Sequence, residues 1–223
     1  MSAPEEVVFL LDCDNTLLDN DHVVADLRSH LTEQFGAASS DRYWEIFETL
    51  RSELGYADYL GALQRYRLER QCDTRLMLMS SFLIDYPFAG RLYPGALDAL
   101  WRLRTIGPTV ILSDGDVVFQ PRKIKQAGLW DAVEGRVLIY IHKEQMLDEV
   151  EQRYPAHRYV MVDDKLRILA AMKQIWEERL KTVFPRQGHY ALDPANLAAY
   201  PPADVTIEHI GDLSSMNLGA LAA

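Results

Sequence analysis

The chain has few basic residues for its size. Its 223 residues include 23 Lys and Arg against 33 Asp and Glu, so the formal net charge is −10. Proteins that bind nucleic acid without sequence preference need a basic surface to neutralise phosphates. The composition therefore argues against nucleic acid as a partner. It permits small anionic substrates, which are bound by local charge rather than by net charge.

Cysteines and long apolar segments are also scarce. Only Cys13 and Cys72 occur, whereas secreted scaffolds usually carry more cysteines in disulfide pairs. No apolar run reaches the length that spans a bilayer. Residues 1–6 are acidic and lack the basic start of a secretory signal. These absences predict a cytoplasmic protein with reduced thiols and no membrane partner.

The sequence does contain short apolar runs that end in polar residues. The runs are residues 7–11, 109–112, 136–141 and 159–162. Such runs are typical of parallel strands that are buried on both faces. Helical patterns lie between them, as over residues 96–106 and 165–180. Strands that alternate with helices predict an α/β fold with a Rossmann-like, doubly wound parallel sheet.

Residues 20–90 follow a different pattern. Apolar residues recur there at helical spacing, as in Val24, Leu27 and Leu31, and no strand pattern is present. We therefore expect an all-helical cap directly after the first strand, called here the helical insert (residues 20–90). The expected domains are an α/β core of residues 1–19 and 91–223 and a cap domain of residues 20–90.

The C-terminal part gives weaker patterns. Residues 181–184 and 205–207 are candidates for short outer strands. Residues 185–202 are expected to form a long loop or a partly ordered excursion. His189 and Tyr190 lie in this loop and receive no predicted role.

Two carboxylates follow the first predicted strand. Asp12 and Asp14 are separated by one residue, so both can reach a site at the carboxyl end of the sheet, where open α/β sheets bind ligands. A carboxylate beside a metal ion is a workable phosphoryl acceptor. The alternative is that these residues only form the turn after the strand.

Polar residues also follow the later strands. The turn at residues 113–115 offers a hydroxyl and exposed N–H groups that suit a phosphate oxygen, and Lys143 offers a cation. Asp163 and Asp164 are adjacent acids that repel each other unless a cation lies between them, and such oxygen ligands suit Mg²⁺. In isolation, each of these residues also has a purely structural explanation. That explanation is helix capping for residues 113–115 and 163–164, and simple solvation for Lys143.

The order of these residues resembles that of the haloacid dehalogenase (HAD) superfamily. An acid pair, a serine, a lysine and a second acid pair stand in turn at the ends of predicted parallel strands. The helical insert is similar to the C1-type cap of the phosphatase branch of that superfamily. The resemblance extends over the whole chain, although only the first motif, residues 12–17, is specific by itself.

The resemblance implies a role for each motif residue. Asp12 is the implied nucleophile, which forms an aspartyl phosphate, and Asp14 is the implied general acid and base. The implied phosphate-binding residues are Thr16, Ser113, Asp114 and Lys143, and Lys143 also stabilises charge during catalysis. The implied ligands of Mg²⁺ are Asp12, Asp163, Asp164 and, through its backbone carbonyl, Asp14.

Two positions depart from the family pattern. The family often places a second acid several residues after the first, whereas Asp163 and Asp164 are adjacent. Because Asp163 comes first after the strand, we expect it to be the main metal ligand. Asp114 stands where a neutral residue is common. Its carboxylate would repel phosphate unless the side chain turns away, for example to cap a helix near Val117.

The predicted function is Mg²⁺-dependent hydrolysis of a small phosphomonoester. Dehalogenases of the superfamily lack an acid at the position of Asp14. Phosphonate-cleaving relatives need a lysine in the cap, and the first lysine of this chain is Lys123. A sugar phosphomutase and a non-catalytic phosphate-binding or regulatory protein stay open as alternatives.

The helical insert is expected to act as a mobile lid that selects a phosphorylated metabolite. Its two linkers, near residues 18–21 and 88–92, should run side by side and form a hinge. The insert contains seven arginines. Among them, Arg75 is our candidate for a residue that faces the cleft and binds a second anionic group.

Overall fold

Six parallel strands form the centre of the protein. The computed structural model describes residues 4–222. The strands are β1 (Glu5–Leu11), β2 (Thr109–Asp114), β3 (Val137–Tyr140), β4 (Ala156–Val162), β5 (Leu180–Pro185) and β6 (Val205–Ile207). Their order in the sheet is β3-β2-β1-β4-β5-β6, and every neighbouring pair is parallel. The predicted fold class is confirmed, and both candidate outer strands are present.

Alternate residues of β1 pack into two separate hydrophobic cores. Val7, Phe9 and Leu11 belong to one core, and Val8 and Leu10 belong to the other. Successive side chains of a strand point to opposite faces, so a continuous apolar run suits a strand that is covered on both sides. The covering helices are α5 (Ala96–Arg104), α6 (Phe119–Gln126) and α7 (Leu129–Ala132) on one face, and α8 (Leu147–Arg153) and α9 (Leu166–Trp176) on the other.

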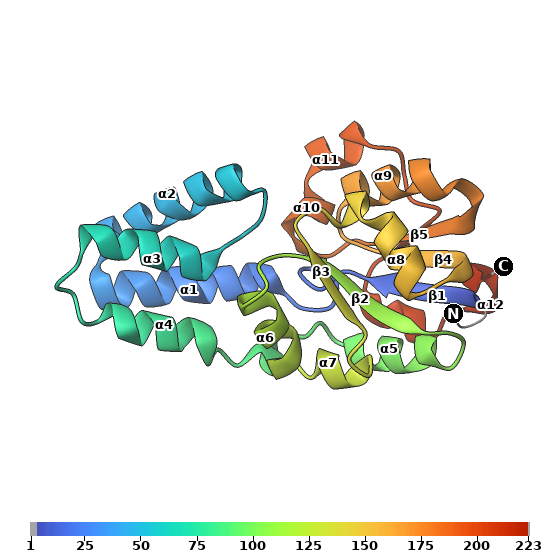
Figure 1. Cartoon of the computed structure of the whole chain (residues 1–223), viewed down its shortest axis with the longest axis horizontal. Helices are drawn as coiled ribbons and strands as arrows, with labels where there is room; N and C mark the ends of the chain where they lie inside the picture. Colours follow the sequence, from blue (N-terminus) through green and yellow to red (C-terminus); the bar gives the residue numbers. More distant parts are fainter. Residues whose placement is uncertain (1–3, 223) are drawn as a thin grey trace.

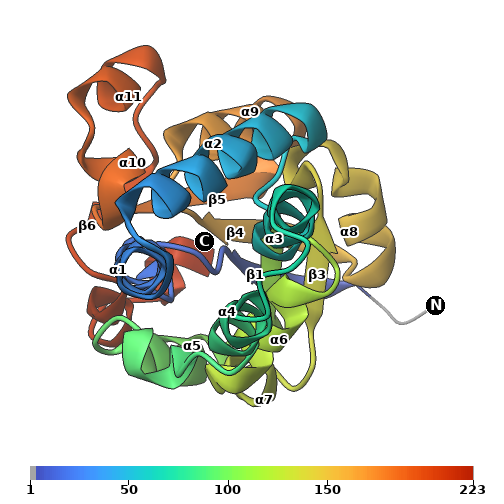
Figure 2. The same cartoon turned by 90° about the vertical axis from the view of Figure 1, so that its left-hand side faces the viewer.

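The helical insert lies between β1 and β2 in the sequence and contains four α-helices. They are α1 (Asn20–Phe35), α2 (Ala37–Leu54), α3 (Tyr59–Glu69) and α4 (Leu76–Ile84). The helices pack side by side and extend away from the sheet (Figure 1), and Figure 2 shows them from their own end of the molecule. The all-helical character of residues 20–90 is as predicted. The assignment of these residues to a separate domain stays a prediction.

The two linkers of the insert run side by side, as expected. Leu18 forms an antiparallel bridge with Leu92. The N–H of Asp19 donates to the carbonyl of Arg91 at 2.8 Å, and the N–H of Tyr93 donates to the carbonyl of Leu17 at 3.0 Å. A 3₁₀ helix, η1 (Phe88–Arg91), completes the returning linker. Paired linkers of this kind suit a hinge.

Residues 185–202 are more regular than the loop or partly ordered excursion that the sequence indicates. They contain α10 (Gly188–Leu192) and α11 (Pro194–Ala199). These helices are too short to show helical periodicity, so the sequence pattern did not indicate them. The carboxylate of Asp193 caps α11 by accepting the N–H of Ala195 at 2.9 Å. The first of these helices, α10, follows β5 directly and contacts α1.

The other helical turns are short. They are η2 (Lys143–Gln145), η3 (Glu177–Arg179), η4 (Ile210–Ser214) and α12 (Gly219–Ala222). Among residues 4–222, no helix combines the length and the apolarity needed to cross a membrane.

Candidate active site

The predicted site residues lie together at the carboxyl edge of the sheet. Asp12 follows β1, Ser113 is near the end of β2, Lys143 follows β3, and Asp163 follows β4. The chain leaves β1 toward β2 on one side and later returns to β4 on its other side. Asp12 therefore stands where the strand order reverses, which is where open α/β sheets bind ligands.

Lys143 is at the centre of the charged groups. Its Nζ lies 2.6 Å from Oδ1 of Asp12 and 2.6 Å from Oδ2 of Asp163. Burial by itself would lower the pKa of Lys143, but the two carboxylates raise it well above its usual value. Lys143 is therefore a cation. It occupies one oxygen of Asp12, whereas Oδ2 of Asp12 has no hydrogen-bond partner among the described residues.

Asp12, Asp163 and Asp164 form a buried cluster of acids. One oxygen from each lies within 4.8 Å of the others. Burial raises the pKa of Asp163 to about 6, against the attraction of Lys143, and burial also raises the pKa of Asp164. Clustered carboxylates with free oxygens suit a hard divalent cation. The cluster is therefore compatible with a divalent metal ion.

The contacts of the two adjacent acids differ. Oδ1 of Asp163 accepts the backbone N–H of Lys165 at 2.8 Å, and Oδ2 forms the ion pair with Lys143. Both oxygens of Asp164 are buried and lack a hydrogen-bond partner among the described residues. The backbone N–H of Asp164 donates to Oγ1 of Thr16 at 3.1 Å, which fixes the position of the residue. Asp164 therefore has more uncommitted oxygens than Asp163, and which of the two is the main metal ligand stays a prediction.

The carboxylate of Asp14 is held by α6 and not by the acid cluster. Lys123 Nζ donates to its two oxygens at 2.8 and 2.9 Å, and Gln120 Nε2 donates to Oδ2 at 3.2 Å. Lys123 is 1% exposed and also donates to Oδ1 of Asn20 at 3.1 Å. Burial tends to lower the pKa of Lys123, but Asp14 raises it overall. The implied metal contact of Asp14, through its backbone carbonyl, stays a prediction.

Sequence reasoning missed Gln120 and Lys123. The two residues stand three positions apart, so they share one face of α6, and both are buried. Phe119 and Ile124, the apolar neighbours of this face, gave the only available signal. Two polar residues beside the apolar face of a short helix are too common a pattern to identify a site.

Asp114 lines the site, and its carboxylate does not cap the helix near Val117. Its Oδ1 accepts the backbone N–H of Lys143 at 2.8 Å. The capping role belongs to Asp116, whose Oδ1 accepts the N–H groups of Val118 and Phe119 at 2.8 and 2.7 Å. Asp114 instead fixes the backbone that carries Lys143. Ser113 accepts a hydrogen bond from Gln120 at 3.0 Å and lies beside it in the site.

The segment after β5 also belongs to the site. Gln187 Nε2 donates to the backbone carbonyl of Thr16 at 3.2 Å. The backbone N–H of His189 donates to Oδ2 of Asp21 at 2.8 Å, and its Nδ1 lies 2.6 Å from Oδ1 of the same carboxylate. No sequence pattern indicates these contacts, because they join residues that are far apart in the chain.

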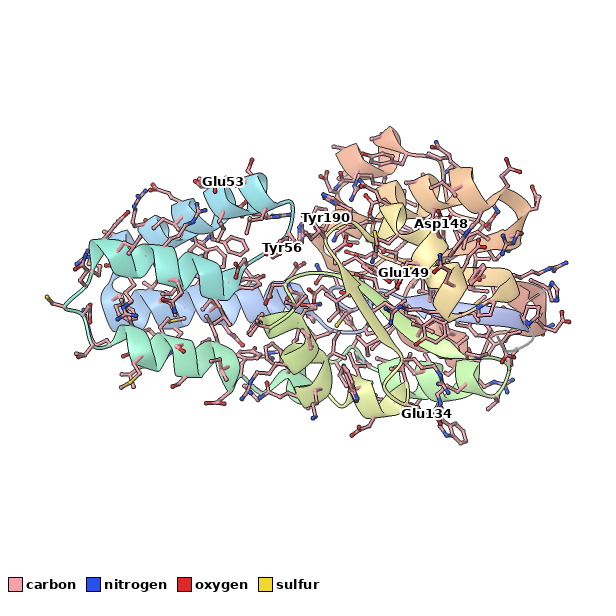
Figure 3. All side chains as sticks on the ribbon, in the orientation of Figure 1. Glu53, Tyr56, Glu134, Asp148, Glu149 and Tyr190 are labelled. Carbon is pink, nitrogen blue, oxygen red and sulfur yellow. The ribbon has the colours of Figure 1, made fainter. Side chains whose placement is uncertain are left out.

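A cavity of about 610 Å³ lies between the helical insert and the carboxyl edge of the sheet. Asp14 and Asp114 line it, and Arg51 of α2 reaches across it to donate a hydrogen bond to the Tyr190 hydroxyl. Figure 3 labels Tyr190 and Tyr56, which lie on facing sides of this gap. Arg75, our candidate in the insert, does not line the cavity and instead pairs with Asp73 at 2.7 Å.

Residues 7–175 match the haloacid dehalogenase-like hydrolase family. The chain belongs to this family. The crystal structure of a haloacid dehalogenase-like hydrolase from Burkholderia xenovorans is 75% identical to it, with a TM-score of 0.91, and covers 96% of this chain and 100% of its own. The predicted superfamily is therefore confirmed, and the protein is a HAD-like hydrolase.

More distant structures share the fold of this HAD-like hydrolase. An L-2-haloacid dehalogenase from Xanthobacter autotrophicus is 18% identical, with a TM-score of 0.65 over 98% of this chain and 100% of its own. The HAD hydrolase YfnB from Bacillus subtilis, bound to magnesium, is 15% identical, with a TM-score of 0.61 over 95% of this chain and 98% of its own. No curated protein sequence matches the chain.

Proposed function

We propose that this HAD-like hydrolase is a Mg²⁺-dependent phosphatase that forms an aspartyl phosphate on Asp12. The observation that carries the proposal is the carboxylate of Asp14, which lines the cavity two residues after Asp12. Hydrolysis of a phosphomonoester needs a proton donor for the leaving alcohol and a base for the attacking water. Asp14 supplies both functions, whereas the dehalogenases of the superfamily have no acid at this position.

The first half of the reaction transfers the phosphoryl group to the enzyme. Oδ2 of Asp12, which is free of hydrogen bonds, attacks phosphorus while Lys143 holds Oδ1 at 2.6 Å. The bond from phosphorus to the alcohol oxygen breaks, and Asp14 gives its proton to that oxygen. The free alcohol leaves, and Asp12 carries the phosphoryl group.

The second half regenerates Asp12. Asp14, now a carboxylate, takes a proton from a water molecule as the water attacks phosphorus. The bond from phosphorus to Asp12 breaks, and inorganic phosphate leaves. The sum of the two halves is an ester and water giving an alcohol and phosphate. Lys123 and Gln120 keep Asp14 in one position for both proton transfers.

Asp12, Asp163 and Asp164, with the backbone carbonyl of Asp14, are the residues that would hold Mg²⁺. The fit rests on the clustering of the three carboxylates and on the free buried oxygens of Asp12 and Asp164. When bound, Mg²⁺ offsets negative charge on the carboxylates and on the phosphoryl group. Thr16, Ser113 and Lys143 are the proposed ligands of the phosphoryl oxygens.

A phosphatase assay tests the proposal. The purified protein should release phosphate from p-nitrophenyl phosphate and from small phosphorylated metabolites with Mg²⁺, and EDTA should abolish this activity. Asp12→Asn should remove turnover because an amide is not a nucleophile, while circular dichroism shows an unchanged fold. Full activity of Asp12→Asn, or full activity after EDTA, would contradict the assignment of the nucleophile or of the metal.

Assays of the same purified protein distinguish a phosphatase from two other activities of the superfamily. Halide release from L-2-chloropropionate without phosphate release would assign a dehalogenase. Transfer of a phosphoryl group between sugar positions without release of inorganic phosphate would assign a phosphomutase. Neither result is expected, because Asp14 is in place for proton transfer and the open cavity admits water.

A further inference from the structure

The cavity beside Asp14 is large compared with a phosphate group. Its volume of about 610 Å³ lies within the range of sites that enclose whole organic ligands. Asp12 lies beneath it, 3% exposed, with its neighbours Asp14 and Asn15 among the lining residues. A phosphomonoester bound at Asp12 would therefore place its alcohol part in this cavity.

Aromatic side chains line the cavity from both sides. They are Trp44, Phe47, Tyr56 and Tyr59 from the insert and Tyr190 and Tyr200 from the C-terminal segment, with the imidazoles of His142 and His189. Phe47 and Tyr59 stack at 4.7 Å, so this wall is rigid. Tyr56 and Tyr200 are half-buried and contribute rings near the open side. Aromatic walls bind planar rings by stacked and edge-to-face contacts.

The charged groups of the lining are mostly engaged with the protein itself. Asp21 pairs with His189 at 2.6 Å, and Arg167 pairs with Glu144 at 2.6 Å. Arg51 donates to the Tyr190 hydroxyl and lies 3.6 Å from Glu48.

The remaining lining cation, Lys165, lies over the ring of Tyr190, 5.0 Å from its centroid. Arg51 and Arg167 would have to break one of their contacts to bind a second anionic group on the substrate. Apart from Lys165, the surface left for recognition is therefore mainly the faces and edges of rings.

We propose that the substrate is a phosphomonoester of an alcohol that carries a planar ring. This inference rests on the proposed phosphatase function. The phosphoryl group lies at Asp12, and the ring lies against the aromatic lining of the cavity. The reaction is hydrolysis of the ester to the ring-bearing alcohol and inorganic phosphate, with no other reactant than water.

Three synthetic esters separate planarity from size and from leaving-group chemistry. Benzyl phosphate, cyclohexylmethyl phosphate and ethyl phosphate all release primary alcohols. The first two have similar bulk, but only benzyl phosphate has a planar ring. We expect kcat/KM for benzyl phosphate to exceed that for cyclohexylmethyl phosphate by about five- to tenfold, the range of an aromatic contact. Equal values for the two would overturn the inference.

Variants of cavity residues test whether the preference for a planar ring arises in the cavity. Tyr56→Leu and Tyr200→Leu should each reduce the ratio of benzyl to cyclohexylmethyl turnover, with a smaller effect on ethyl phosphate. Tyr154→Leu is the matched control, because Tyr154 is half-buried and lies outside the cavity. Equal losses on all three esters in Tyr56→Leu and Tyr200→Leu would show that the rings only maintain the shape of the insert.

A binding measurement separates this inference from the proposed function. Titration calorimetry of Asp12→Asn with benzyl and cyclohexylmethyl phosphate compares affinities without turnover. Tighter binding of benzyl phosphate supports the ring site even if the wild-type protein hydrolyses no phosphomonoester, in which case only the phosphatase proposal fails. Hydrolysis of all three esters with equal affinities leaves the phosphatase proposal intact and removes the ring site.

Discussion

At the scale of single residues, the pairing of Asp14 with Lys123 has a direct consequence for proton transfer. Lys123 Nζ is within 2.9 Å of both oxygens of Asp14 and is almost fully buried. Lys123 is thus a positioning residue for Asp14.

The first prediction concerns Lys123. Lys123→Met should lower kcat by about ten- to a hundredfold, because Asp14 loses its main hydrogen bonds. Lys123→Arg should restore part of the rate by keeping the cation. Lys125→Met, at an exposed position of the same helix, is the control. An unchanged kcat in Lys123→Met would rule out this role.

The second prediction ranks the two adjacent acids. Asp164→Ala should raise the Mg²⁺ concentration for half-maximal activity more than Asp163→Ala does, because both oxygens of Asp164 are uncommitted. Asp163→Ala should instead lower kcat, since Lys143 loses one of its two carboxylates. Metal titrations of both variants at constant substrate decide the ranking. The reverse order would restore Asp163 as the main ligand.

At the scale of elements, the turn that starts α10 is packed against the turn after β1. Gly188 has a φ of +72°, and a Cβ there would lie 2.5 Å from Cβ of Asn15. Asn15 in turn donates to Oδ1 of Asp21 at 3.0 Å, the same oxygen that pairs with His189. The two turns therefore hold each other in place.

The third prediction uses two glycines with similar backbones. Gly188→Ala should lower kcat/KM by about tenfold or more, because the added methyl group displaces Asn15 in the catalytic loop. Gly128→Ala is the matched control, since Gly128 has a φ of +79° but no atom within 4 Å of the added methyl group. Both variants should lose stability through backbone strain, by about 1 kcal/mol. A similar activity in the two variants would separate the α10 turn from catalysis.

The joint between β5 and β6 depends on Asp204. Its Oδ2 accepts the N–H and the hydroxyl of Thr182 at 2.8 and 2.9 Å and the ammonium of Lys173 at 3.2 Å. Burial tends to raise the pKa of Asp204, but these hydrogen bonds hold it below its usual value. Because the folded-state pKa is the lower one, this stabilisation is present above the unfolded-state pKa of about 4 and is lost as the pH falls through the folded-state value.

The fourth prediction follows from the lowered pKa of Asp204 in the folded protein. Asp204→Ala should lower the free energy of unfolding at pH 7 by about 1–3 kcal/mol, the cost of leaving its donors without a charged acceptor. The difference from the wild-type protein should shrink below about pH 4. Urea unfolding at several pH values measures it, with the exposed residue Asp98 changed to Ala as the control. A difference that is independent of pH would mean that packing, and not charge, is lost.

At the scale of the whole molecule, several contacts join the insert to the rest of the chain, and two of them bear on its opening. Near the hinge, Leu18 pairs with Leu92. At the far side of the cavity, Arg51 of α2 donates to the hydroxyl of Tyr190 in α10. Opening of the insert about the linkers would separate Arg51 from Tyr190 and leave the bridge at Leu18 in place.

The fifth prediction tests that movement. Tyr190→Phe keeps the ring but removes the acceptor, so the closed form should be less populated and KM should rise by about three- to tenfold. Small-angle scattering with and without phosphate analogue should show a more extended variant than wild type. Tyr154→Phe, outside the cavity, is the control. Unchanged KM and scattering in Tyr190→Phe would show that this contact does not control closure.

The sheet and the polar residues at the ends of its strands could be predicted from the sequence alone. Apolar runs such as residues 7–11 can be buried only in a strand that is covered on both faces, and parallel strands bring their carboxyl ends to one edge. Asp12, Ser113, Lys143 and Asp163 were therefore predictable as neighbours. The helical insert was predictable for a similar reason, since amphipathic spacing over residues 20–90 is a local property of the chain.

The contacts that those residues make depend on the tertiary structure and could not be predicted from the sequence. Lys123 reaches Asp14 across 109 positions of the chain, and His189 reaches Asp21 across 168. No local pattern reports such contacts, because they depend on the angles at which separate elements pack. The difference between Asp163 and Asp164 likewise depends on the backbone after β4. It turns the carboxylate of Asp163 toward Lys143 and leaves that of Asp164 with free oxygens. Periodicity determines which face of an element is buried, whereas packing determines which polar groups meet there.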